Sequence, residues 1–120
     1  MKKILFISSE VHPLIKTGGL ADVAGSLPIA LAELGQEVRI LMPKYQALKL
    51  EQEVEYRCPL RVNNRDVNIL ETRLPGSGVI VWLVDCPEYF DTPGNPYTDE
   101  FGNAWENSAA RFSLFCRIAV

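Results

Sequence analysis

The chain has 120 residues, of which 48% are hydrophobic, and a formal net charge of −3. This length and composition predict one globular domain or part of one, with roughly two-thirds of the unfolded surface buried. The 12 Lys and Arg residues are scattered, which argues against a nucleic-acid binder because affinity for the phosphate backbone needs clustered cations. No apolar stretch approaches the roughly 20 residues of a membrane helix, so we expect no membrane partner.

The three cysteines, Cys58, Cys86 and Cys116, are odd in number, lie far apart and form no CxxC pair. Neither a disulfide framework nor a structural zinc site is therefore expected. His12 is the only histidine, and a lone histidine builds neither a metal site nor a Ser-His-Asp arrangement without partners. We interpret it as a loop residue, and we expect no metal, reduced thiols and a cytoplasmic location.

The first predicted elements are a strand and a helix. Ile4–Ile7 is a continuous apolar run, the pattern of a strand that is covered on both faces, and we place this strand at the centre of a parallel sheet. Apolar residues recur at helical spacing over Leu20–Leu34, and Gly35 follows where a C-terminal glycine cap belongs. Pro28 lies inside this helix, so we expect it to kink the helix or to divide it.

A second strand and a hairpin follow. Glu37–Met42 is an apolar strand, so strand, glycine loop, helix and strand make one βαβ unit with a right-handed crossover. Glu53–Arg61 and Asp66–Leu74 alternate more loosely between apolar and polar residues. Asn63 and Asn64 between them predict a β-hairpin turn, which makes the hairpin an insertion into the parallel pattern.

The last elements are a buried strand, a long loop and a helix. Val79–Asp85 is apolar, Pro87–Asn103 is rich in Pro, Gly and Asn, and Asn107–Val120 has helical spacing without a C-terminal cap. The missing cap suggests a chain that is cut within this helix. The fold class is thus α/β, a Rossmann-like parallel sheet with an inserted hairpin. Ligands bind such sheets at the carboxyl ends of the strands, so the loop after the first strand and the loop over Pro87–Asn103 are predicted to form the walls of one cleft.

The most informative motif is Lys16–Leu20, Lys-Thr-Gly-Gly-Leu, which follows the first strand and precedes the first helix. Gly18 and Gly19 allow a tight turn that exposes backbone N–H groups, the helix adds its positive N-terminal end, and Lys16 adds a cation. These features predict a cradle for an anion such as a sugar diphosphate. The alternative is a solvated loop lysine beside two glycines. The segment matches neither GxGxxG nor the P-loop pattern, so motif rules do not identify the nucleotide.

Three further residues near these loops have two interpretations each. Thr17 could cap the helix or touch the ligand, and Asp22 is favourable near the helix N-terminus through the dipole alone. Tyr97 lies in the turn-rich segment Thr92–Asp99. Its ring could stack on a glucose ring, or its hydroxyl could bond a sugar hydroxyl, or the side chain could simply pack its own loop.

Other aromatic and acidic residues are assigned less specifically. Trp82 lies inside a strand and is interpreted as a core residue rather than a carbohydrate platform, and Trp105 near a helix start is left open. Glu10 and Asp85 lie at strand ends on the ligand side of the sheet, where a carboxylate either accepts a sugar hydroxyl or caps a nearby loop. No pair of carboxylates can be assigned as general acid and base.

The segments Lys3–Glu10 and Pro13–Val23 closely resemble the N-terminus of bacterial glycogen synthases and plant starch synthases. The match continues through the sequence Gly-Ser-Leu-Pro at residues 25–28 and covers essentially the whole chain. The resemblance implies a glycosyltransferase with two Rossmann domains, the GT-B type. Residues 1–120 would be the first part of its N-terminal domain, the starch synthase catalytic domain, truncated at the C-terminal end.

The resemblance also implies a reaction and its site. The family moves glucose from ADP-glucose to the non-reducing end of an α-1,4-glucan such as glycogen, with retention of configuration and without a metal ion or cofactor. In these synthases the lysine of the Lys-Thr-Gly-Gly loop binds ADP-glucose. The candidate substrate-binding residues are Lys16, Thr17, Gly18, Gly19, Asp22 and Tyr97. The family's catalytic groups lie beyond Val120, so the chain alone is expected to be inactive, and the alternative is a non-catalytic nucleotide-binding or remnant Rossmann-like module.

Overall fold

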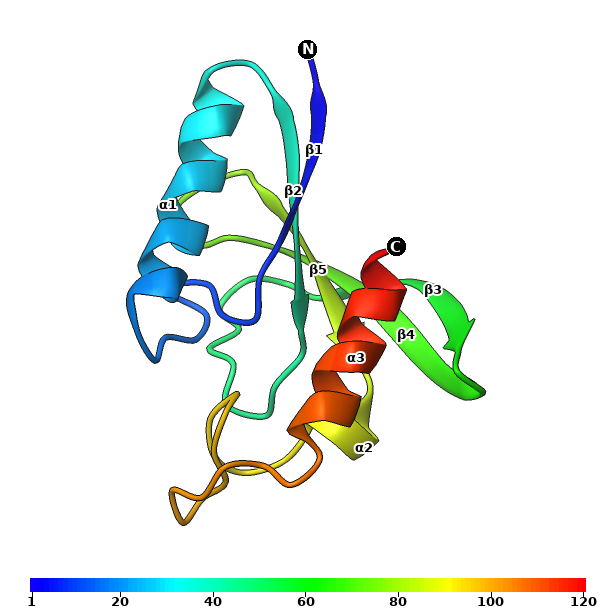
Figure 1. Cartoon of the computed structure of the whole chain (residues 1–120). Helices are drawn as coiled ribbons and strands as arrows, with labels where there is room; N and C mark the ends of the chain where they lie inside the picture. Colours follow the sequence, from blue (N-terminus) through cyan, green and yellow to red (C-terminus); the bar gives the residue numbers. More distant parts are fainter.

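A computed structural model describes all residues from 1 to 120 (Figure 1). One five-stranded sheet has the strand order β1-β2-β5-β4-β3. The strands are β1 (Lys3–Ile7), β2 (Glu37–Pro43), β3 (Glu55–Val62), β4 (Arg65–Arg73) and β5 (Ile80–Asp85), and the helices are α1 (Gly19–Glu33), α2 (Pro87–Phe90) and α3 (Ser108–Ala119). β1, β2 and β5 run parallel, and β4 and β3 add as an antiparallel hairpin. The predicted α/β sheet with an inserted hairpin is confirmed.

The position of β1 differs from the prediction. β1 lies at the edge of the sheet, with β2 as its only neighbour, so its predicted place at the centre is wrong for this structure. Its residues alternate in burial, and Leu5 and Ile7 are 40% and 48% exposed. The apolar run correctly marked a strand, but composition does not determine how many neighbours a strand has, because strand pairing is set by the rest of the chain.

α1 is one continuous helix, so of the two predicted effects of Pro28 the division is wrong, and the kink stays a prediction. Proline removes one backbone donor, and the Pro28 side chain lies on the buried side of the helix. The predicted glycine cap is confirmed: Gly35 has φ +88°, and its N–H donates to the carbonyl of Ala32. The next N–H, from Gln36, donates to the carbonyl of Leu31, which completes a Schellman motif.

The buried side of α1 carries small residues. Ala21 and Ala24 are fully buried, whereas the larger Leu20 and Val23 are 50% and 52% exposed. Small side chains let the helix backbone approach the sheet and the preceding loop closely. The helical spacing of apolar residues therefore predicted the helix correctly, but the largest apolar residues do not mark its buried face.

The hairpin turn agrees with the sequence. Asn63 and Asn64 both have positive φ, 51° and 60°, and Val62 pairs with Arg65 across the turn. Two successive residues with positive φ are the requirement of a type I′ turn, whose twist matches that of the flanking strands, and asparagine tolerates this conformation.

The two long helices lie on opposite faces of the sheet. Val38 lines a cavity with α1 residues, whereas Leu41, at an odd separation on the same strand, lines a groove with α3 residues. Successive side chains of a strand point to opposite faces, so α1 and α3 cover different faces. On the face that α1 covers, Ile40 of β2 and its neighbour Val81 of β5 have no exposed surface. No helix of the structure is long and apolar enough to cross a membrane.

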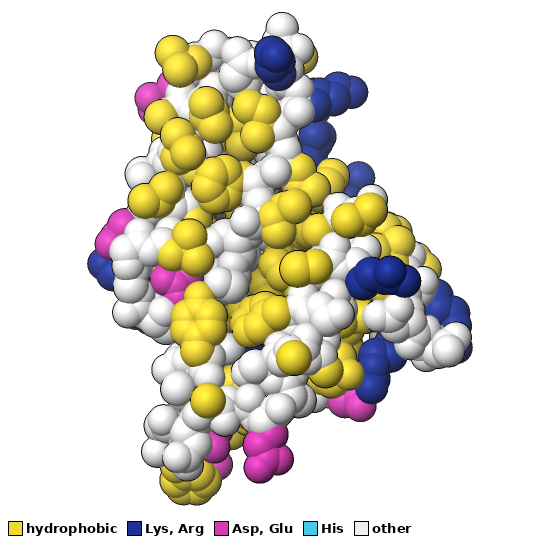
Figure 2. Space-filling model, viewed as in Figure 1, with side chains coloured by type: hydrophobic (Ala, Val, Ile, Leu, Met, Phe, Trp, Pro, Cys, Tyr) yellow, Lys and Arg dark blue, Asp and Glu magenta, His cyan; other side chains and the backbone are white.

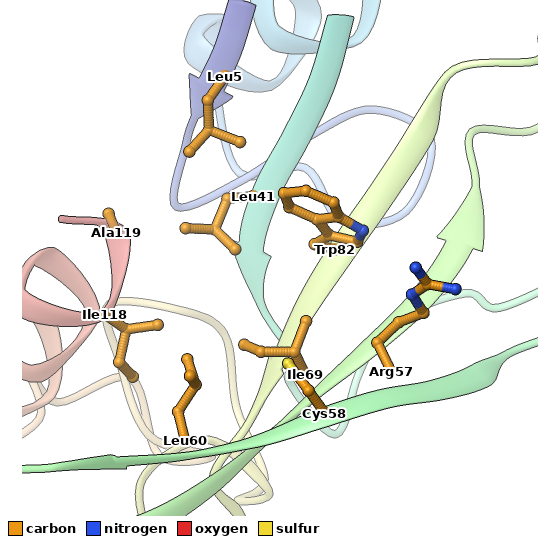
Figure 3. A pocket seen from close by; sticks show the side chains of 9 residues that line it. All are labelled: Leu5, Leu41, Arg57, Cys58, Leu60, Ile69, Trp82, Ile118 and Ala119. Atoms are coloured by element: carbon orange, nitrogen blue, oxygen red, sulfur yellow. The ribbon is translucent and has the colours of Figure 1, made fainter.

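The face that carries α3 is only partly covered. Figure 2 shows hydrophobic side chains gathered over the middle of this view. A groove between the sheet and the C-terminal end of α3 has a volume of about 360 Å³, and eight of the nine residues that line it are hydrophobic (Figure 3). Trp82 lines it from β5, stacks under the guanidinium of Arg39 at 5.1 Å and donates its indole N–H to Glu71. The indole is therefore partly buried against the core and lines the groove on this face of the sheet.

Candidate functional site

Glu10 organises the start of α1 from the loop that follows β1. Its side chain is buried, and one carboxylate oxygen accepts the N–H groups of Gly18 at 3.2 Å and Ala21 at 3.1 Å. The other oxygen accepts the Thr17 hydroxyl. Gly18, the N-cap residue, has no side chain that could cap the helix, so Glu10 does so from a distance. Of the two roles considered for Glu10, capping is the observed one, and Thr17 assists it.

The outer side of the same helix end is open. The N–H groups of Gly19 and Leu20 donate no hydrogen bond to any protein group. A Cβ atom built on Gly18 or Gly19 would meet no atom within 4 Å. Gly18 has an extended backbone, φ −163°, which any residue adopts, so backbone strain does not require a glycine there. These two unpaired N–H donors lie at the positive end of a helix and face open space, so they can bind an anion.

Lys16 and Asp22 lie beside these donors and form an ion pair. The Lys16 Nζ atom lies 2.9 and 2.8 Å from the two carboxylate oxygens of Asp22. Both side chains are about half exposed, 48% and 51%. An exposed pair of this kind contributes only about 0.2 to 1 kcal/mol, so a phosphate group can replace the carboxylate at little cost.

Tyr97 connects the second predicted loop to the first. Its hydroxyl lies 2.6 Å from the Ser9 hydroxyl, and its ring centroid lies 6.2 Å from that of Phe112 on α3. Its backbone N–H donates to the side-chain oxygen of Asn95, as expected for a turn-rich segment. Burial raises the pKa of the Tyr97 hydroxyl. Tyr97 therefore packs against Phe112 and its own loop, which is one of the roles considered for it. The residue still keeps 37% of its surface exposed. Sequence reasoning missed Ser9, although it lies only two residues after the end of β1.

Arg111 holds the second loop in place, and sequence reasoning did not identify it. The residue is 1% exposed, and its guanidinium has no carboxylate partner. Instead it donates to the carbonyls of Tyr89 at 2.7 Å and Pro96 at 3.3 Å, and it lies 4.8 Å from the ring of Trp105. Burial lowers the pKa of Arg111. Trp105, left open above, stacks on this cation and donates its indole N–H to the carbonyl of Asn95.

Tyr45 adds a neutral hydroxyl to the interior near these loops. It follows β2, is 4% exposed, and its hydroxyl has no hydrogen-bond partner. Burial, with a smaller contribution from Tyr97, holds the pKa of Tyr45 far above its usual range. No motif in the sequence marked this residue, because a tyrosine after a strand is an ordinary core residue.

Gly25 was quoted above only as part of the family resemblance, and the structure gives it a packing role. A Cβ atom at Gly25 would lie 2.3 Å from the carbonyl oxygen of His12. The His12 N–H also donates to the carbonyl of Ala21 at 3.0 Å. The loop after β1 therefore lies directly against α1, and His12 contributes its backbone to this contact, as expected of a loop residue.

The predicted cleft between the two loops has a different form. None of the five cavities described in the structure is lined by residues of both loops, and the loops instead touch at Ser9 and Tyr97. Lys16 lines a cavity of about 480 Å³ with residues 12–15 and the segment after β2, which includes Lys49. Asp85 makes no side-chain hydrogen bond to the chain, so it does not cap a loop, and its role as an acceptor for a sugar hydroxyl stays a prediction. No cluster of three His, Cys, Asp or Glu side chains is placed to hold a metal ion.

Comparisons with known proteins agree with the sequence resemblance. The family model of the starch synthase catalytic domain matches residues 3–120. Glycogen synthase 1 of Methylococcus capsulatus is 52% identical over 98% of this chain and 24% of its own length, and the glycogen synthase of Marinobacter nauticus is 51% identical over 100% and 25%. The solved catalytic domain of Starch Synthase IV from Arabidopsis thaliana, bound to ADP and acarbose, superimposes with a TM-score of 0.78 at 25% identity and covers 96% of this chain and 24% of that one. The chain thus spans about a quarter of the length of these relatives.

Proposed function

Because the chain belongs to the starch synthase catalytic domain family, we propose that it is part of a glycogen synthase. The reaction transfers glucose from ADP-glucose to the non-reducing end of an α-1,4-glucan, glycogen, with retention of configuration. ADP-glucose is a substrate here, and no cofactor is required. Residues 1–120 would form the first part of the N-terminal Rossmann-like domain of a GT-B enzyme. Support comes from the glycogen synthase relatives and from the similar starch synthase that holds ADP and acarbose.

The observation that carries the proposal is the open end of α1. The N–H groups of Gly19 and Leu20 have no partner, and Lys16 is held only by an exposed carboxylate. A nucleoside diphosphate would accept both N–H groups and would replace Asp22 as the partner of Lys16. N–H donors that are already oriented toward the diphosphate stabilise the negative charge that develops on it. This charge develops as the bond between the anomeric carbon of glucose and the diphosphate oxygen breaks.

The remaining site residues have supporting roles in this proposal. Thr17 holds the loop through Glu10, and Asp22 keeps Lys16 beside the helix end before the donor binds. Tyr97 lies on the facing loop with its ring partly exposed, where it can contact the sugar of the donor or the glucan. The catalytic groups that act on the glycosidic bond would lie outside these residues.

A chimera tests the proposal. In it, residues 3–120 replace the matched segment of the Methylococcus capsulatus glycogen synthase 1, which is 52% identical over that region. We expect the chimera to incorporate labelled glucose from ADP-glucose into glycogen, and the 120-residue chain alone to incorporate none. A folded but inactive chimera contradicts the proposal, and the alternative of a nucleotide-binding module gains support if the chain then still binds ADP. Label incorporation by the chain alone at the chimera's rate contradicts the expectation that it is catalytically incomplete.

The same experiment addresses the behaviour of the chain in solution. Leu5 and Ile7 on the edge strand and Leu20 and Val23 on α1 expose apolar surface, and an unpaired strand edge favours association. We therefore expect the isolated chain to associate in size-exclusion chromatography and the chimera to elute as a defined species. A stable, monodisperse monomer of the isolated chain would contradict this expectation.

We also propose a cytoplasmic location. All three cysteines are free, and Cys58 and Cys116 are exposed. Exposed free thiols persist in a reducing compartment. Fractionation of cells that express the chimera, with thiol labelling of the recovered protein, tests this location.

A further inference from the structure

Glu10 is a buried carboxylate that connects three points of the following chain. It accepts the Thr17 hydroxyl and the N–H groups of Gly18 and Ala21, which lie 7, 8 and 11 residues further on. Only 1% of the residue is exposed, so the carboxylate is almost completely shielded from solvent and from a ligand. These contacts fix the backbone on both sides of Gly19.

No cation neutralises this carboxylate. Lys16, the closest lysine in sequence, is engaged by both oxygens of Asp22 instead. A buried carboxylate without a cation is costly unless it is fully hydrogen-bonded. The charge of Glu10 is therefore stabilised by its three donors and by the positive end of α1, which makes the local backbone dependent on that carboxylate.

The contacts also divide the donors of the helix end into two sets. An α-helix begins with N–H groups that have no partner within the helix. Glu10 takes those of Gly18 and Ala21 on the buried side, and those of Gly19 and Leu20 remain unpaired on the open side. Which donors remain for an anion is thus set by Glu10.

We propose that Glu10 is a positioning residue for the diphosphate of the donor: it does not contact the donor, but it orients the Gly19 and Leu20 N–H groups toward it. This inference rests on the proposed function. Without Glu10, the Thr17–Gly19 segment loses its anchor, and the buried N–H groups have to turn toward water. The two outer donors then lose their fixed direction, and the binding of the diphosphate weakens.

The test uses the chimera defined above with ADP as the probe. We expect Glu10→Ala to weaken ADP binding in calorimetry about tenfold, which corresponds to one hydrogen bond to a charged group, and to raise KM for ADP-glucose similarly. Glu10→Gln should rescue most of this loss. Its amide oxygen can accept both N–H groups, and the Thr17 hydroxyl can turn to accept from the amide nitrogen.

Two controls separate positioning from stability and from the proposed function. Val81→Ala removes a fully buried side chain of β5 that has no part in the site, and it serves as a variant of lowered melting temperature. Hydrogen exchange of the peptide that contains residues 17–21 should accelerate in Glu10→Ala and remain slow in Val81→Ala. Unchanged exchange or unchanged ADP affinity in folded Glu10→Ala overturns the proposal, as does an equal loss of affinity in Val81→Ala. Failure of the parent chimera to bind ADP points instead to failure of the proposed function.

Discussion

The first and second turns of α1 use glycine for opposite reasons. At the first turn, Gly18 and Gly19 have open space where a side chain would be. At the second turn, a Cβ atom on Gly25 would collide with the carbonyl oxygen of His12. The space beside the first turn is thus free for a ligand. The space beside the second turn is already filled by the backbone of His12.

This difference separates binding from packing on one short helix. The first turn carries Asp22, the exposed partner of Lys16, while the second turn packs through the buried Ala24. Substitutions of the exposed residues at the first turn should therefore change ligand affinity at nearly constant stability. Substitutions in the second turn should change stability at nearly constant affinity of the folded protein.

The largest effect is expected at Lys16. In the chimera, Lys16→Ala should weaken the use of ADP-glucose by about 10- to 150-fold, because a hydrogen bond to a charged group contributes about 1.5 to 3 kcal/mol. Lys16→Arg should retain part of the activity that Lys16→Ala loses. Steady-state kinetics measures both, and Lys49→Ala, which removes another lysine lining the same cavity, is the matched control. Unchanged donor affinity and rate in Lys16→Ala would remove Lys16 from the site.

The next effect is on stability at Gly25. Gly25→Ala should lower the free energy of unfolding by about 1 to 3 kcal/mol, the usual cost of overpacking, because the backbone at His12 has to move. Thermal melts measure this change, and ADP titration of the folded variant should match the parent. A melting temperature equal to that of the parent would mean that the loop yields freely, and the contrast between the two turns would then disappear.

Gly18 and Gly19 should show the reverse pattern. With Ala at either position, we expect a change in the free energy of unfolding within about 1 kcal/mol, since alanine meets no atom at either residue and favours the helix at Gly19. ADP affinity should fall about tenfold, because the methyl group occupies the approach to the unpaired N–H groups. Melts and calorimetry on the same samples decide the matter. Early unfolding combined with normal ADP binding would show that these glycines are structural and that the cradle interpretation is wrong.

The smallest effect is expected at Asp22. Asp22→Asn breaks an ion pair whose side chains are half exposed, so stability should change by less than about 1 kcal/mol. ADP affinity should stay near the parent value or rise, because Lys16 no longer has a competing carboxylate. Salt-dependent melts and ADP titration provide the readout. A fall in affinity of about tenfold would instead show that Asp22 itself contributes to donor binding.

Local signals in the sequence determined much of this protein. Gly35 after a helical pattern predicted the cap, and the two asparagines predicted the hairpin turn, because each acts on the backbone within a few residues. The Lys-Thr-Gly-Gly segment predicted an open helix end with a lysine beside it, and its resemblance indicated the family that the comparisons confirm. Such features depend on neighbours in the chain, so the sequence alone shows them.

Only the tertiary structure decided the rest. The pairing of β1 at an edge, the contact of Ser9 with Tyr97 across 88 residues, and the burial of Arg111 against carbonyls of a distant loop all depend on how separate segments meet. The identity of a residue does not specify a partner far along the chain, because serine, tyrosine and arginine are also ordinary surface residues. For the same reason Glu10 had two possible roles in the sequence. Its role as a buried cap follows from folding, which brings the end of β1 against the start of α1 and leaves three donors around one carboxylate.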